Sequence, residues 1–144
     1  MDPSDIMKND RSHKYDSQSK ERHIPSIEVL KNYGNSGKDY IHVVVGENVK
    51  HPNSLQHQIQ WIELYARTKM QNTIQIGRVN FAPGTSPDAL FRLIYFGKYR
   101  EFCALAYCNV HGLWQNCIEI REELRLTADA VEKNVCRKDS ESKI

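Results

Sequence analysis

Two segments of the chain carry the hydrophobic pattern of β-strands. Residues 39–46 form a run rich in β-branched side chains between Gly37 and Gly46, as is typical of a short strand. Apolar and polar residues also alternate over residues 73–81, where Gly77 interrupts the alternation. This second pattern predicts either one strand with a bulge or two short strands.

Two helices are predicted in the middle of the chain. The first is expected over residues 54–67, with Ser54 as its N-cap and with apolar residues at helical spacing. The second is expected over residues 85–97, where Pro87 suits a first helical turn. The apolar positions of the first helix are Leu55, Ile59, Ile62 and Ala66.

Two more helices are predicted further along, over residues 99–110 and 113–124. Residues 103–107 also fit a strand, so helix and strand both remain open for residues 98–110. The apolar positions at helical spacing are Tyr99, Phe102, Cys103, Ala106 and Val110, and then Leu113, Cys117, Ile120 and Leu124.

These patterns divide the chain into three parts. Residues 1–23 carry five basic and five acidic side chains and almost no apolar ones, so we expect a disordered arm. Residues 24–126 are expected to form a single α+β domain, with short strands in the N-terminal half and amphipathic helices in the C-terminal half. Residues 127–144 are expected to form a tail.

The charge balance narrows the classes of function. Lys and Arg number 20 against 18 Asp and Glu, which gives a net charge of +2 over 144 residues. This total excludes a strongly basic nucleic-acid binder and an acidic, solvating chain. The sequence contains no apolar run of membrane-spanning length and no secretory signal pattern, so we expect a soluble intracellular protein.

The cysteines give the one local cluster of metal-ligand residue types. Its spacing is unlike that of structural zinc sites, so buried apolar cysteines are favoured over a metal site, and no cofactor is predicted. The six histidines match no ligand spacing that we recognise. The cluster comprises Cys103, Cys108, His111 and Cys117, with Cys136 as the fourth cysteine of the chain.

The same residues are the candidates for nucleophilic catalysis. Cys103 or Cys108 could act beside His111 as nucleophile and base. A histidine at the end of a helix is favoured by the helix dipole without any chemistry, and no known catalytic motif is present. We therefore expect no catalytic residues and no enzyme.

A basic and aromatic surface is the candidate for nucleic-acid contact. Arg92, Lys98 and Arg100 lie among tyrosine and phenylalanine side chains, and this composition suits phosphate contact and base stacking. The alternative is an ordinary solvated surface. So few charges would give only weak, salt-sensitive RNA affinity.

The middle of the chain resembles the geminivirus pre-coat proteins. The resemblance lies in residues 83–94, 98–101 and 109–111, with residues 52–55 as an upstream match. The family's cluster of cysteines and histidine near the C-terminus is absent, and Met1–Gly46 is an extension that the family generally lacks. The matching positions are Pro83, Thr85, Leu90, Arg92, Tyr99, Glu101 and His111.

This resemblance implies a viral suppressor of host post-transcriptional RNA silencing that also aids cell-to-cell movement. It implies that the partner is a host silencing-amplification protein that protects double-stranded RNA. It also implies that the protein is located in the host cytoplasm, and it leaves open whether the protein is found near the nucleus and at the cell periphery. Partner binding is assigned to Tyr99, Glu101, His111 and Leu113. Direct RNA contact and self-association are left open.

The alternative function belongs to another class. It is a small nucleic-acid-binding or matrix-like structural protein that oligomerises through its helices. Large assemblies and a steep dependence of nucleic-acid binding on salt would distinguish it from a suppressor that works as a monomer or dimer.

Overall fold

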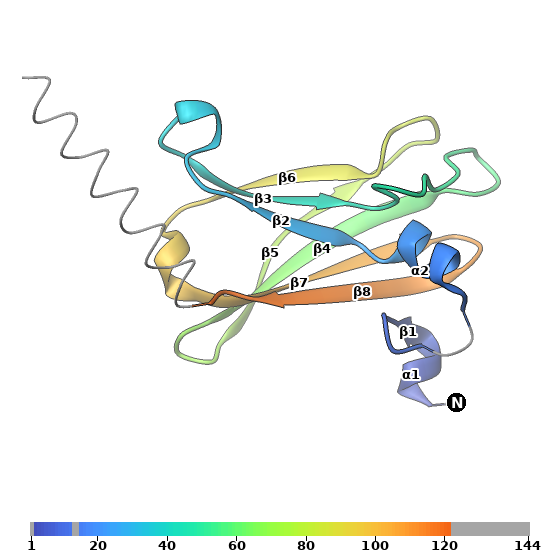
Figure 1. The fold of residues 1–144 in the computed structure, drawn as a ribbon, viewed down its shortest axis with the longest axis horizontal. Helices are drawn as coiled ribbons and strands as arrows, with labels where there is room; N and C mark the ends of the chain where they lie inside the picture. The colour runs from blue at the N-terminus through green and yellow to red at the C-terminus, as the bar shows by residue number, and fades with distance from the viewer. Residues whose placement is uncertain (1, 13–14, 122–144) are drawn as a thin grey trace, which may run out of the picture.

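The computed structural model describes residues 2–12 and 15–121, and these residues form a two-layer β-sandwich (Figure 1). Neighbouring strands are antiparallel except β1 and β8, which are parallel. One sheet has the order β1 (Met7–Lys8), β8 (Gly112–Glu119), β7 (Tyr99–Cys108), β4 (Ile59–Thr68), β5 (Thr73–Asn80). The other has the order β2 (Ser26–Leu30), β3 (Asp39–Val44), β6 (Asp88–Leu93).

Helical structure in the described part of the chain is short. Two α-helices, α1 (Pro3–Ile6) and α2 (Ser17–His23), precede the first strand of the three-stranded sheet, and the 3-10 turns η1 (Tyr33–Asn35) and η2 (Phe96–Lys98) connect strands. No helix among the described residues has both the length and the apolar character that a membrane crossing requires.

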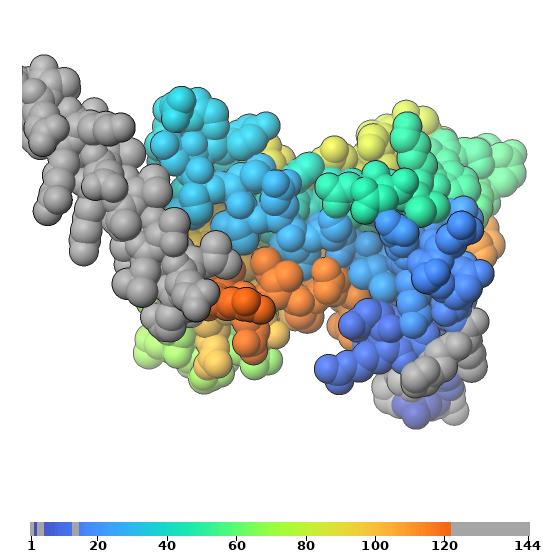
Figure 2. Space-filling model, viewed as in Figure 1, coloured from blue at the N-terminus to red at the C-terminus, as the bar shows by residue number. Residues whose placement is uncertain are grey.

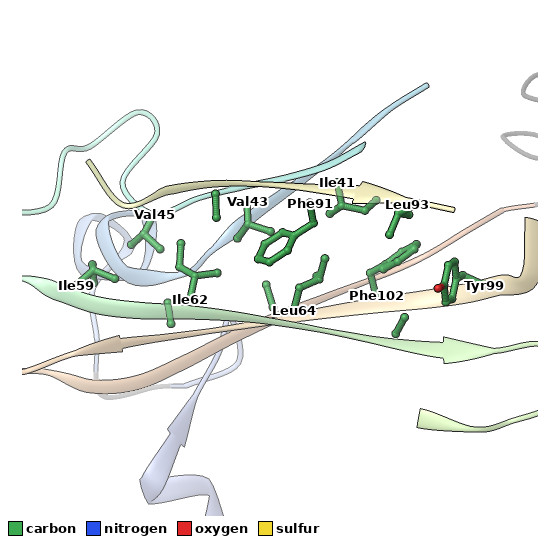
Figure 3. Close-up of a cluster of buried hydrophobic side chains, with 14 of the residues drawn as sticks. Ile41, Val43, Val45, Ile59, Ile62, Leu64, Phe91, Leu93, Tyr99 and Phe102 are labelled. Carbon is green, nitrogen blue, oxygen red and sulfur yellow. The ribbon is translucent and has the colours of Figure 1, made fainter. Parts of the chain in front are cut away.

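The hydrophobic core lies between the two sheets (Figure 3). A Cβ added at Gly77 of β5 would lie 2.9 Å from a ring carbon of Phe91 on β6, so the sheets meet closely here and a side chain at this position would displace the ring. The labelled core side chains are Ile41, Val43, Val45, Ile59, Ile62, Leu64, Phe91, Leu93, Tyr99 and Phe102.

Both strand predictions are confirmed. Residues 39–46 contain β3, in which Ile41 and Val43 are fully buried. Residues 73–81 contain β5 as one strand with an irregularity, because Leu64 of β4 pairs with Gly77 while the next residue, Tyr65, pairs with Gln75. Of the two alternatives, one strand with a bulge is therefore the correct one.

The predicted α+β class with C-terminal amphipathic helices is wrong, because strands occupy all four helical segments. In β4 and β7 the apolar spacing was misleading because the pairing between these two strands is irregular. The register of β4 against β7 shifts between Ile59 and Trp61, so Ile59 and Ile62 are both buried although three positions separate them. A bulge resets the two-residue alternation and imitates helical spacing.

Strand β7 shows the same effect. A register shift between Arg67 and Thr68 of β4 lies beside the start of β7, where Tyr99 and Phe102 are both buried. From Phe102 onward every second residue faces the core. The strand interpretation that was left open for residues 98–110 is therefore the correct one for β7.

The disordered arm expected over residues 1–23 is not seen in its described residues. Strand β1 pairs with β8, and α2 begins after Asp16, whose side chain accepts a hydrogen bond from the Ser19 N–H at 2.8 Å. Tyr15 packs edge-on against Trp114, with ring centroids 4.9 Å apart, so long-range contacts hold this polar segment. The tail expected over residues 127–144 lies outside the described residues, and the three-part division stays a prediction.

Candidate metal centre

Four potential metal ligands from separate segments meet at one end of the sandwich. His23 ends α2, His51 and His57 lie in the connection between β3 and β4, and Cys108 ends β7. One ligand atom from each of the four lies within 4.8 Å of the others. Figure 2 shows the N-terminal residues in dark blue against this end of the molecule.

His111 adds a fifth donor from the turn between β7 and β8. Its Nδ1 lies 3.2 Å from Nε2 of His57 and 3.8 Å from Sγ of Cys108. Gly112 follows with φ of +83°, a left-handed conformation that suits glycine and lets the chain enter β8 directly. The backbone N–H of His111 donates to Cys108 Sγ at 3.3 Å, so the turn itself stabilises a thiolate.

Hydrogen bonds to backbone carbonyls orient two of the imidazoles. Nδ1 of His23 donates to the Ser19 oxygen at 2.7 Å, and Nδ1 of His51 donates to the Pro52 oxygen at 2.6 Å. Each bond places the ring proton on Nδ1 and leaves the Nε2 lone pair unprotonated. Both Nε2 atoms are buried without a hydrogen-bond partner, which is costly unless they bind something.

The electrostatic surroundings keep these histidines neutral. Burial lowers the pKa of His23 to about 4, and burial also lowers that of His51 to about 4. The pKa of His57 is lowered by burial, by His111 and by Arg22. Metal binding requires the unprotonated imidazole, so His23, His51 and His57 are available as ligands at neutral pH.

The donor set fits a redox-capable transition metal. Four imidazoles and one thiolate exceed the four tetrahedral ligands that structural zinc normally takes. Imidazole suits iron, copper, nickel and zinc, and thiolate adds a soft, electron-rich donor. The residues that could hold the ion are His23, His51, His57, Cys108 and His111.

Two further side chains fix the turn that carries His111. The carbonyl oxygen of His111 accepts hydrogen bonds from Lys8 Nζ at 2.6 Å and from Trp114 Nε1 at 3.2 Å. Lys8 also lies over the rings of Tyr15 and Trp114. The N-terminal segment is thus connected to the metal-binding turn.

Arg22 brings a positive charge to the centre. It precedes His23 directly, is half-buried, and lowers the pKa of both His51 and His57. Its Nε is buried without a hydrogen-bond partner. An anion that approached the centre would meet this charge.

The predicted partner-binding residues are mostly remote from the centre. His111 belongs to it, but Tyr99 lies at the opposite end of β7, nine residues or about 30 Å from Cys108. Tyr99 is also buried. Glu101 pairs with Arg67 at 3.5 Å, and Leu113 lies opposite Met7 in the β8–β1 pair.

The three predicted RNA-binding residues are exposed but come from different elements. Arg92 is on β6, Lys98 is in η2, and Arg100 is on β7. Lys98 Nζ lies 5.1 Å from the ring centroid of Tyr99. RNA binding by these residues stays a prediction.

The clustered cysteines separate in the fold. Cys108 is a buried free thiol in the centre, whereas Cys103 and Cys117 form a disulfide between β7 and β8. His111 lies in a β-turn, so the helix-dipole explanation of it is wrong.

Sequence reasoning missed His23, His51 and His57. They lie in different segments, so no spacing connects them. The one local signal is the Cys-x-x-His pair at residues 108–111, which ends a strand and leads through Gly112 into the next one.

Comparisons with known proteins assign the chain to a different family from the one that the sequence suggested. The model of the family described as desulfoferrodoxin matches residues 15–117. A superoxide reductase of Pyrococcus abyssi is 39% identical over 104 residues, which cover 69% of this chain and 88% of that protein.

Solved structures agree in fold and sequence. The superoxide reductase (neelaredoxin) of Ignicoccus hospitalis is 32% identical with a TM-score of 0.68, covering 84% of this chain and 98% of that one. The superoxide reductase (1Fe-SOR) of Giardia intestinalis is 34% identical with a TM-score of 0.61, covering 70% and 100% of the two chains.

These matches correct the functional predictions. The resemblance to geminivirus pre-coat proteins is wrong, because the relatives are superoxide reductases of cellular organisms. The functions in silencing suppression and movement, the host silencing partner and the host-cytoplasm location are therefore wrong as well. The matrix-like structural alternative is wrong for the same reason, and so is the prediction that the chain is not an enzyme. The resemblance rested on short motifs, whereas the family match extends over most of the described chain. The chain belongs to the desulfoferrodoxin family.

Proposed function

We propose that this chain is a superoxide reductase that binds one iron ion through His23, His51, His57, Cys108 and His111. The observation that carries the proposal is the meeting of four imidazoles and one thiol at one end of the sandwich. The family membership and the relatives named superoxide reductase support it, one of them described as a one-iron protein.

The protein's own residues prepare the centre. Bound iron would supply the electron that, together with two protons, converts superoxide to hydrogen peroxide. The lowered pKa values of His23 and His51 keep both rings available as ligands at neutral pH. The N–H of His111 holds Cys108 as an electron-rich donor, and the carbonyl contacts of His23 and His51 fix their rings.

Arg22 would attract the substrate. Superoxide is a small anion, and a half-buried guanidinium beside His51 and His57 raises its local concentration and its rate of association. Because the attraction is electrostatic, it should weaken as salt increases.

The first test is product stoichiometry with purified, iron-loaded protein and an external electron donor. A reductase forms one hydrogen peroxide per superoxide and no oxygen, whereas dismutation forms half as much peroxide together with oxygen. We expect reductase stoichiometry in the wild type and its loss in His51→Ala. His42→Ala is the matched control, because His42 lies on β3 outside the centre and should leave the stoichiometry unchanged. Oxygen release by the wild type, or equal activity in His51→Ala, would refute the proposal.

A second test addresses Arg22. In Arg22→Gln the second-order rate constant with superoxide should fall about tenfold, within the usual range of electrostatic steering, and should lose most of its salt dependence. Arg92→Gln is the control, since it removes an exposed charge on β6. Equal rates and salt slopes for the two variants would exclude steering by Arg22.

A further inference from the structure

A second group of metal-ligand residue types lies on the outer face of the five-stranded sheet. Cys103 on β7 pairs in register with Cys117 on β8, and their Cα atoms are 4.0 Å apart across the disulfide. Cys103 precedes Cys108 by five positions, or about 17 Å along the strand, and points to the opposite face. The pair is therefore separate from the histidine centre.

Glu101 completes this group. Its Oε1 lies 4.0 Å from Sγ of Cys103, and one ligand atom from each of Glu101, Cys103 and Cys117 lies within 4.8 Å of the others. Glu119 on β8 is directly opposite Glu101 in the strand register. Two sulfurs and two carboxylates thus occupy neighbouring positions on one face of the β7–β8 pair.

The disulfide is accessible to a reductant. Cys117 is exposed and Cys103 is half-buried, whereas Cys108 is fully buried. Reducing compartments hold accessible thiols in the dithiol form. In that form the two sulfurs become potential metal ligands, and we expect them to remain aligned because the pairing of β7 and β8 continues on both sides of the disulfide.

We propose that reduction of the Cys103–Cys117 disulfide opens a binding site for one soft divalent cation, with zinc as the probe. A dithiol or phosphine reductant supplies two electrons, the S–S bond breaks, and the two sulfurs take up two protons. Zinc then displaces these two protons and binds both thiolates. The Glu101 carboxylate supplies an oxygen ligand, and water or Glu119 supplies the fourth ligand. Two thiolates and two oxygens are within the ligand chemistry of zinc.

The ion pair between Arg67 and Glu101 competes only weakly with a cation at this site. Arg67 pairs with Glu101 at 3.5 Å, and this half-exposed ion pair would have to open. Exposed ion pairs contribute little free energy, so the competition costs little. Hydrogen peroxide, as a two-electron oxidant, would take two electrons from the thiolates and with two protons become two waters, so that the S–S bond reforms and the cation is released. The site is therefore controlled by redox state.

The experiment compares zinc uptake by the oxidised and the reduced chain in a Cys136→Ser background. The protein is reduced with a phosphine, freed of reductant without oxygen, and equilibrated with zinc, and bound metal is measured by atomic emission. Uptake at the histidine centre is common to both states, because Cys108 is not part of the disulfide. We expect one additional zinc per chain in the reduced state only.

Variants locate the additional zinc. Cys103→Ser/Cys117→Ser should bind no additional zinc in either state. Glu101→Gln keeps the disulfide and should weaken the additional zinc at least tenfold. Glu28→Gln removes an exposed carboxylate on the other sheet and should have no effect. Equal zinc content in both redox states, additional zinc retained by the double serine variant, or resistance of the disulfide to the phosphine would overturn the proposal.

Discussion

The imidazole of His23 stacks face to face on the indole of Trp114, with ring centroids 4.8 Å apart and planes inclined by 17°. Trp114 is fully buried, and its Nε1 donates to the carbonyl oxygen of His111 at 3.2 Å. The Trp114 side chain therefore contacts two of the five proposed metal ligands, His23 and His111. Residues that orient metal ligands in this way commonly change metal affinity when they are replaced.

Trp114→Phe should lower iron affinity by 10–100-fold, the usual range for such supporting residues. Phenylalanine keeps an aromatic ring against His23 but cannot donate to His111. Competition with a chelator of known affinity measures the change. Trp61→Phe is the matched control, because Trp61 stacks on Tyr107 outside the centre. Equal affinities for the two variants would contradict a role for the indole N–H.

The metal-free protein should lose stability as the pH falls from about 6.5 towards 4. Burial lowers the pKa of His23 and of His51 from 6.5 to about 4, so between these values the unfolded chain binds more protons than the folded chain. Stability therefore rises with pH through this window and is complete above it. Each histidine contributes at most roughly 3 kcal/mol, at 1.36 kcal/mol per pH unit.

Urea unfolding in the presence of a chelator, repeated across this pH range, measures that slope. His23→Gln/His51→Gln removes both titrating groups and should show a markedly flatter profile. A wild-type profile as flat as that of the variant would show that the two histidines do not titrate as described.

His42 should behave in the opposite way. Burial lowers its pKa, but hydrogen bonds to Asp88 and to Glu28 outweigh burial and raise it overall. The group thus contributes stability that is fully present below pH 6.5 and is lost as the pH rises through the folded pKa. Titration of the ring protons by NMR should give a pKa above 6.5, and Asp88→Asn should lower it. Asp10→Asn, a change remote from β3, should leave the His42 titration where it is in the wild type.

Glu63 should be important for the stability of the outer sheet face. This buried carboxylate accepts hydrogen bonds from Tyr65, from Gln75 at 3.1 Å and from Arg78 at 3.0 Å. Arg78 also lies 4.5 Å from the ring centroid of Trp61. Glu63→Gln would weaken charge-assisted bonds and leave donors poorly matched, at a cost of about 1–3 kcal/mol in urea unfolding. Glu119→Gln, an exposed change on the same sheet, should cost less than about 0.5 kcal/mol. Similar costs for the two would argue against the network.

The sequence predicted β3 and β5, which are bounded or interrupted by glycine, but it missed β6, whose burial alternates regularly and whose pairing with β3 shows no register shift. In β3 the β-branched run between two glycines was sufficient to predict the strand, and in β5 Gly77 indicated the position of the bulge. In β4 and β7 the register shifts carry no such residue, so their apolar spacing imitated a helix. Local spacing cannot reveal a bulge that is defined by the partner strand.

The sequence by itself determined the local features of this protein: the alternating strands, the Cys108-x-x-His111 pair and the glycine turn that follows it. Only the tertiary structure brought His23, His51 and His57 to that pair, and only the β7–β8 register joined Cys103 to Cys117. The physical reason is that both groups are formed by contacts between segments far apart along the chain. Such contacts depend on the packing of two sheets and on strand register, which hydrophobic periodicity does not specify.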